Sequence, residues 1–158
     1  MTGFGTATLL QPGEGHAFTI AADRVTVKGS TPEGSDGFAV VEYAGASGQP
    51  GPPLHVHHTF EEAWYILEGE VDFTLEGRTV RGSTGTYVLI PRGVPHTFAV
   101  AGGRAARWVG IFSPARFVRM LEELGAVFPQ DGPPDPQRVL DVFRAWDTEI
   151  VEAPGTGA

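Results

Sequence analysis

The sequence contains no cysteine. This absence excludes disulfide bonds, thiolate metal sites and thiol nucleophiles, so any metal site would have to use imidazole and carboxylate ligands. No apolar run approaches the roughly 20 residues that span a bilayer, and the first ten residues lack a basic segment followed by an apolar one. We therefore expect a soluble, cytoplasmic protein without a secretory signal.

Basic residues are also scarce. The chain has 11 lysine and arginine residues against 19 aspartate and glutamate residues, a formal net charge of −8. Such a surface repels the phosphates of nucleic acids and anionic lipids, so we expect neither nucleic acid nor membrane as a partner. The sequence also lacks a Gly-x-x-x-x-Gly-Lys phosphate loop, a dinucleotide-binding fingerprint and a Gly-x-Ser-x-Gly nucleophile elbow. The expected partner is a small-molecule substrate.

Glycine and proline, by contrast, are abundant: 22 glycines and 13 prolines make up more than a fifth of the 158 residues. Both residues break helix interiors, which excludes a helix bundle or a coiled coil. An apolar content of 41% argues against disorder. The composition therefore predicts a single, mainly β domain of many short strands joined by turns.

Turn-forming glycines separate short segments that are rich in β-branched and aromatic residues. In the clearest of them Val71, Phe73 and Leu75 share one face, and polar residues alternate with them on the other. Short strands at such regular spacing predict a sandwich or a barrel. The expected strands cover residues 18–28, 38–43, 63–67, 70–76, 86–90, 96–100 and 107–112.

Two short helices are predicted after these strands. Ser113 can cap a helix that begins at Pro114 and ends at Gly125, and Asp135 can cap a second helix over residues 136–146. Two such helices are too small to fold alone, so we expect an appendage to the β domain. The predicted division is a loose arm (1–14), a β-barrel (15–113), a helical appendage (114–150) and a flexible tail (151–158).

Three of the five histidines have the spacing of a metal site. His55 and His57 are two residues apart, so on a strand both imidazoles project from one face. Glu62 opens the next strand, and His96 follows a turn at residues 91–95 that brings it to the start of another. Three imidazoles and one carboxylate suit one divalent transition metal, namely Fe, Mn, Ni, Co, Cu or Zn.

The residues around this group resemble the two sequence motifs of the cupin superfamily. The stretch 55–69 reads His-Val-His, four residues, Glu, six residues, Gly, which is the family spacing from the first histidine onward. Glu62 keeps the six-residue spacing to Gly69, whereas Glu61 does not. The leading glycine of the first motif is replaced by Gln49.

The second motif matches at four positions. Gly85, Pro91, Gly93 and His96 stand at the family spacing, and Val100 replaces the terminal asparagine. Both departures from the family pattern concern turn shape and strand packing rather than metal ligation.

The resemblance is to a small, single-domain cupin of the quercetin-dioxygenase-like kind. It implies a mainly β fold, the double-stranded β-helix or cupin jelly-roll barrel, with two short C-terminal helices. It further implies a metal in the mouth of the barrel, with His55, His57, Glu62 and His96 as ligands. A homodimer is expected, because cupins commonly pair through the barrel; alternatively, the two helices cover the barrel of their own chain.

This ligand set leaves a divalent ion with a net charge of +1, which attracts an enolate or phenolate, lowers the pKa of bound water, or binds dioxygen. The first hypothesis is a dioxygenase-like enzyme for an enolisable or phenolic small molecule, with Glu62 as both ligand and catalytic proton acceptor. The second is a redox-neutral Lewis-acid cyclase or isomerase, similar to cupins that fold aromatic polyketides. The third is a metal-dependent binding module without turnover. The sequence favours an enzyme without deciding between these hypotheses.

Other histidines and aromatic residues receive weaker assignments. His58 points away from His57 on a strand, so we expect it behind a ligand or at the surface, and we expect His16 to be structural or exposed. Five aromatic residues are candidates for a hydrophobic pocket, although most of them are expected to pack in the core. They are Tyr65, Phe73, Tyr87, Phe98 and Trp108.

Overall fold

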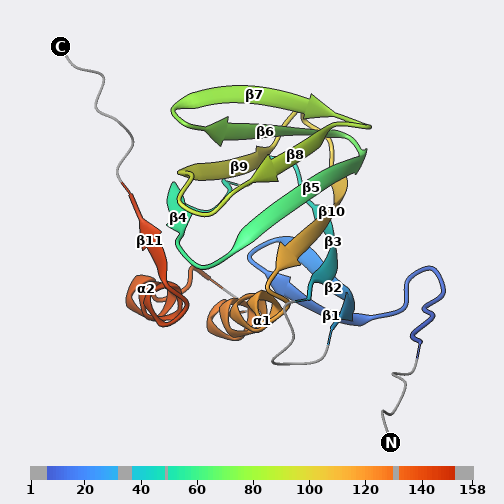
Figure 1. The fold of residues 1–158 in the computed structure, drawn as a ribbon. Coiled ribbons are helices and arrows are strands. Elements are labelled where there is room, and N and C mark those ends of the chain that lie inside the picture. The colour runs from blue at the N-terminus through green and yellow to red at the C-terminus, as the bar shows by residue number, and fades with distance from the viewer. Residues whose placement is uncertain (1–6, 32–36, 49, 130–131, 152–158) are drawn as a thin grey trace, which may run out of the picture.

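The protein is described by a computed structural model over residues 7–31, 37–48, 50–129 and 132–151. Within these ranges the chain forms two antiparallel β-sheets and two helices, α1 (Phe117–Val127) and α2 (Pro136–Ala145) (Figure 1). The strands are β1 (His16–Ile20), β2 (Asp23–Ser30), β3 (Ala39–Gly45), β4 (His55–His57), β5 (Glu61–Glu68), β6 (Glu70–Leu75), β7 (Arg78–Ser83), β8 (Tyr87–Ile90), β9 (His96–Val100), β10 (Ala106–Ser113) and β11 (Thr148–Ile150).

The chain passes back and forth between the two sheets. One sheet has the strand order β1-β2-β3-β10-β5-β8, and the other has the order β11-β4-β9-β6-β7. Strand β4 therefore lies in a different sheet from β5, and β8 in a different sheet from β9. This is the predicted double-stranded β-helix, and the mainly β fold with two short helices is confirmed. Both helices lie together at the lower end of the barrel in Figure 1.

The core lies between the sheets and is built largely from aromatic rings. Along β3 every second residue is buried, as expected for a strand with one face turned to a core. Tyr43 of β3 stacks on Trp108 at 5.2 Å between ring centroids and on Trp64 at 5.7 Å. The Trp64 ring in turn packs 4.5 Å from Phe98 of the opposite sheet. These rings join the two sheets across the barrel.

Three features of the strands differ from the sequence-based expectation. The predicted strand 18–28 is a hairpin of β1 and β2, because Ala21 adopts a positive φ of 52° and the chain reverses there. Strand β7 was not predicted, since all its residues except Gly82 are exposed and it shows no apolar alternation. Strand β11 was not predicted either, because it has only three residues and follows a helix; it pairs with β4.

The helices also differ in their ends. Helix α1 begins at Phe117, not at Pro114, because Ser113 is still paired with Glu61 in the sheet. Gly125 lies inside α1 instead of ending it; a Cβ at this position would lie 2.8 Å from the ring of Phe18, so glycine allows α1 to approach β1 closely. Helix α2 begins at Pro136 with Asp135 as its cap, as predicted.

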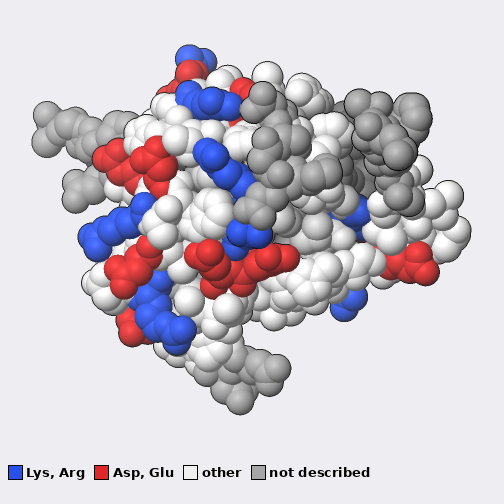
Figure 2. Space-filling view, turned by 60° about the horizontal axis from the view of Figure 1, so that its bottom comes forward, with Lys and Arg blue, Asp and Glu red and all other residues white. Residues whose placement is uncertain are grey.

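Acidic and basic side chains lie interspersed on the face shown in Figure 2. One of the ion pairs in the protein joins Arg81 to Asp72 through two hydrogen bonds of 2.8 and 2.9 Å. In the part of the chain that the structure describes, neither helix has the length and apolar character that would let it cross a membrane. Most of the predicted tail (151–158) and part of the predicted arm (1–14) lie outside the described residues, as does Gln49.

Candidate metal centre

The three predicted histidines meet on two paired strands of the smaller sheet. His55 and His57 project from the same face of β4, and His96 opens β9 directly opposite His55. One ligand atom from each ring lies within 4.8 Å of the other two. All three side chains are buried. The structure thus brings together three imidazoles that are up to 41 positions apart in the chain.

Two of the rings are oriented by the backbone just before them. The Nδ1 of His55 lies 2.8 Å from the carbonyl oxygen of Pro53, and the Nδ1 of His96 lies 2.8 Å from that of Val94. A carbonyl oxygen can only accept a hydrogen bond, so in both rings Nδ1 carries the hydrogen. When these rings are neutral, Nε2 therefore carries a free lone pair, and this lone pair can bind a metal ion.

The third ring is oriented by a residue that the sequence did not reveal. The Nδ1 of His57 lies 2.8 Å from Oγ1 of Thr148 in β11. The Thr148 hydroxyl can itself donate to the carbonyl of Trp146 at 3.4 Å, which leaves its oxygen free to accept from His57. No motif links two residues that are 91 positions apart; the pairing of β11 with β4 places Thr148 opposite His57.

Replacement of Thr148 by valine tests this orienting contact. We expect the affinity of the protein for Ni(II) to fall about 10- to 100-fold, because the ring of His57 loses the acceptor that holds it in place. A titration in competition with a chelator measures the change. Thr148→Ser keeps the hydroxyl and serves as the matched control. Wild-type affinity in the valine variant would contradict the assignment.

The electrostatics keep two of the imidazoles neutral. Burial is the main cause that lowers the pKa of His55 to about 4 and that of His57 to about 3. At neutral pH both rings therefore hold their lone pairs ready for a metal ion. The protonation of these rings does not compete with metal binding until the solution is strongly acidic.

Glu62 stands next to the histidine group. Its Oε1 lies 2.8 Å from Nε2 of His96. Burial favours the neutral forms of both residues, but their mutual attraction prevails: the pKa of Glu62 is lowered and that of His96 is raised. The neighbouring Glu61 is only partly buried and points toward Arg92, 3.9 Å away. Of the two glutamates, the one with the family spacing is the one beside the histidines.

The donor set fits a divalent transition metal. Nε2 of His96 is buried, and the carboxylate of Glu62 lies beside it at 2.8 Å. A buried imidazole nitrogen and a carboxylate oxygen at this distance can share either a proton or a metal ion. Three imidazole nitrogens with a carboxylate alongside match the ligands preferred by Fe, Mn, Ni, Co, Cu or Zn.

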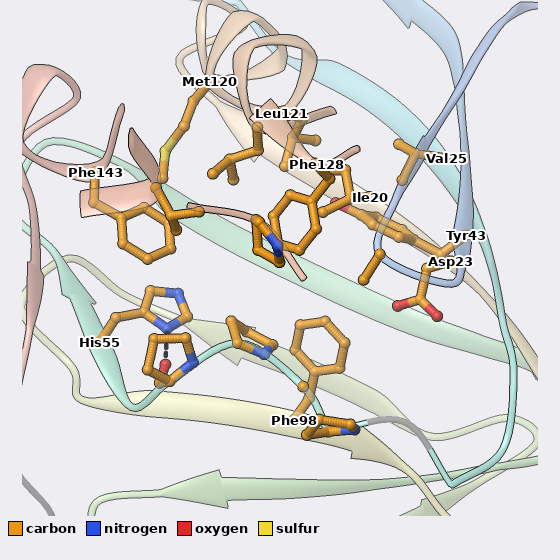
Figure 3. A pocket seen from close by; sticks show the side chains of 18 of the residues that line it. Ile20, Asp23, Val25, Tyr43, His55, Phe98, Met120, Leu121, Phe128 and Phe143 are labelled. Atoms are coloured by element: carbon orange, nitrogen blue, oxygen red, sulfur yellow. Dashed lines mark hydrogen bonds between the residues drawn. The ribbon is translucent and has the colours of Figure 1, made fainter. Parts of the chain in front are cut away.

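A cavity of about 600 Å³ opens from this group, and its walls are mainly apolar (Figure 3). Helices α1 and α2 contribute Phe117, Met120, Leu121, Leu124, Val139 and Phe143 to its lining. The ring of Phe143 stacks on His55 with centroids 6.0 Å apart, and Phe117 meets His57 edge-on at 5.1 Å. The apolar faces of the helices thus cover the barrel of their own chain; the expected homodimer stays a prediction.

The remaining candidates are distributed between surface, core and pocket. His58 lies at the surface with its Nε2 3.0 Å from Glu149, and His16 is exposed near Glu122. Of the five aromatic residues, one lines the pocket (Phe98), two pack in the core without lining it (Phe73 and Trp108) and two are exposed (Tyr65 and Tyr87).

Comparison with known proteins agrees with this fold. A family model described as a cupin domain matches residues 41–112. Quercetin 2,3-dioxygenase of Bacillus subtilis (strain 168) is 32% identical over 96 residues, which are 61% of this chain; the match spans 28% of that relative's length.

Two solved structures have similar folds. The polyketide cyclase RemF from Streptomyces resistomycificus superposes with a TM-score of 0.60 at 25% identity, covering 68% of this chain and 80% of RemF. KdgF from Halomonas sp. gives a TM-score of 0.63 at 22% identity, covering 72% and 99% of the two chains, and shows the fold alone. The matched domain, the curated relative and the observed barrel together support a protein of the cupin superfamily.

Proposed function

We propose that this protein is a metal-dependent enzyme that acts on a small aromatic molecule with an enolisable or phenolic hydroxyl group, with dioxygenase-like chemistry. The observation that carries the proposal is the buried histidine group with Glu62 at the inner end of a largely apolar cavity. A volume of about 600 Å³ lies within the range of small-molecule sites. The similarity to quercetin 2,3-dioxygenase supports the same substrate class.

The metal would be held by His55, His57 and His96, with Glu62 as the expected fourth ligand. When bound, a divalent transition metal supplies a positive charge that favours the ionised hydroxyl of the substrate and, if redox-active, a means of activating dioxygen.

The chain's own residues bind, desolvate and deprotonate the substrate. Phe117 and Phe143 pack against the ligand rings and exclude water from the inner end of the cavity. Glu62 is buried and its pKa is lowered, so its carboxylate is ionised at neutral pH and can take the proton of a substrate hydroxyl. The apolar walls strengthen the interaction between the Glu62 carboxylate and the substrate hydroxyl, because they remove both groups from water.

A redox-neutral cyclase or isomerase is the second candidate, and the similarity to the polyketide cyclase RemF favours it. It would use the same metal group and the same apolar cavity but consume no oxygen. Elemental analysis of the purified protein, followed by measurement of oxygen uptake with a flavonol, separates the two. Oxygen uptake that depends on the metal supports the dioxygenase; turnover without uptake supports the cyclase. Unaltered recovery of a bound ligand would contradict both enzymes.

The Glu62→Gln variant tests the proton acceptor. We expect its flavonol turnover to fall at least 100-fold, because the amide cannot take a proton at neutral pH; general base catalysis typically contributes about 10²–10⁴-fold. Metal content is measured alongside turnover, so that a loss of the ion is distinguished from a loss of the base. Glu61→Gln, a change at the adjacent but outward-facing residue, is the control. Turnover above a tenth of wild type in the metal-loaded Glu62→Gln protein would contradict the role.

A further inference from the structure

Polar groups continue along the inner face of the six-stranded sheet beyond the metal group. Glu62 and Trp64 are two residues apart in β5 and project from the same face. In the strand register, Tyr43 of β3 lies two residues further along the sheet than Trp64, and it pairs with Val25 of β2. Asp23 precedes Val25 by two residues in β2, which runs antiparallel to β3, so Asp23 lies two residues further along the sheet than Tyr43 in the same direction. Glu62, Trp64, Tyr43 and Asp23 all line the cavity.

Asp23 lies away from the histidines. It opens β2 after the turn of the β1–β2 hairpin, and Figure 3 shows it beside Tyr43, across the cavity from His55. The carboxyl accepts a hydrogen bond from the backbone N–H of Ala46. Its Oδ1 is buried and has no hydrogen-bond partner among the described residues. Burial raises the pKa of Asp23, which the bond from Ala46 only partly offsets.

Trp64 carries a second unpartnered group. Its indole Nε1 is buried, and within the described parts of the chain nothing accepts a hydrogen bond from it. The Nε1 of Trp108 is in the same state, but Trp108 does not line the cavity. A buried polar group without a partner destabilises the protein, because it has lost its hydrogen bonds to water. Because Asp23 and Trp64 line the cavity and Trp108 does not, the groups of Asp23 and Trp64 are the ones that a molecule in the cavity is positioned to complete.

Tyr43 lies between the two carboxylates. Burial is the main cause that raises the pKa of its phenol, and the charges of Glu62 and Asp23 add to it. The phenol therefore stays neutral, and its ring forms an uncharged wall stacked on Trp64. A flat molecule that extends from the histidine group toward Asp23 would pass along this wall.

We propose that Asp23 and Trp64 determine substrate specificity: Trp64 Nε1 donates a hydrogen bond to an oxygen in the middle of an elongated aromatic substrate, and Asp23 Oδ1 accepts one from a hydroxyl at its far end. This inference rests on the proposed function, since it assumes that the reacting hydroxyl lies at the histidine group. With these two hydrogen bonds the cavity binds polyphenols more tightly than aromatic molecules that carry the enolisable hydroxyl alone.

Two flavonols test the inference by binding under anaerobic conditions, where an oxidative reaction cannot proceed. Quercetin carries hydroxyl groups remote from its enol, whereas 3-hydroxyflavone has the enol alone; both carry the ring ketone. We expect Asp23→Asn to reduce the preference of the metal-loaded protein for quercetin about tenfold, because the remote hydroxyl then meets a neutral amide instead of a charged carboxylate, which is the stronger acceptor. We expect Trp64→Phe to weaken both flavonols about fivefold, because both can accept from the indole. Fluorescence titration measures the dissociation constants.

Trp108→Phe is the matched control, since it removes an equally unpartnered indole N–H that does not face the cavity. Melting temperatures establish that each variant is folded; if Trp64→Phe does not fold, Asp23→Asn alone decides. An unchanged preference in Asp23→Asn, or equal effects of Trp64→Phe and Trp108→Phe, would overturn the inference while leaving the proposed function intact. If the wild-type protein binds neither flavonol, the proposed substrate class itself is wrong, and the inference falls with it.

Discussion

The His57→Ala variant is expected to bind divalent metal more than about 100-fold more weakly than the wild type. Loss of an outer partner of a ligand already costs about 10- to 100-fold, and the loss of a ligand itself costs more. His57 contributes one of three donor atoms that lie within 4.8 Å of one another. Elemental analysis after dialysis against a weak chelator measures the loss, and His55→Ala and His96→Ala should behave alike.

The adjacent histidine provides the control. His58→Ala removes the same side chain one position further along, but His58 is exposed and paired with Glu149 at the surface. Its metal content should equal that of the wild type. If the His57 and His58 variants retain equal amounts of metal, the assignment of the site is incorrect. This comparison separates ligation from any general effect of removing an imidazole from this segment.

The Trp108→Ala variant should be the least stable of the single substitutions considered. Trp108 is fully buried, stacks on Tyr43 at 5.2 Å and on Trp64 at 5.6 Å, and meets Phe98 edge-on. Deletion of a buried aromatic side chain costs about 3–5 kcal/mol of unfolding free energy, because it combines lost burial with a residual cavity. In a chain of this length that corresponds to a fall of about 10 °C in the melting temperature.

Thermal unfolding followed by circular dichroism measures this effect. Tyr87→Ala is the control, because Tyr87 is 60% exposed and its removal should change the free energy of unfolding by less than about 0.5 kcal/mol. Similar melting temperatures for the two variants would show that the stacked rings do not hold the sheets together. The prediction concerns the metal-free protein, so that metal binding does not mask the loss.

Short-range patterns explain why part of this protein was predictable. Alternation along a strand put His55 and His57 on one face, and the turn at residues 91–95 delivered His96 to the start of β9. The alternation of apolar and polar residues likewise predicts β6, because successive side chains of a strand point to opposite faces. Strand β7 was missed because it is an exposed strand at the edge of its sheet, so neither of its faces needs apolar residues. The β1–β2 hairpin was missed because Ala21 turns without the glycine or asparagine that normally marks a positive φ.

By itself the sequence determined the fold class and predicted the three histidines that the structure brings together, because both depend on residue types at the fixed spacings of the two motifs. Only the tertiary structure decided what surrounds those donors. Thr148 behind His57, Phe143 against His55 and Asp23 across the cavity are brought there by strand pairing and helix packing between distant segments. Such contacts leave no local pattern, because each depends on where the whole chain folds rather than on its neighbours. Gly125 is a further example. In the sequence it is typical of a helix end, but in the structure it lies inside α1, where the absence of a side chain leaves room for the ring of Phe18.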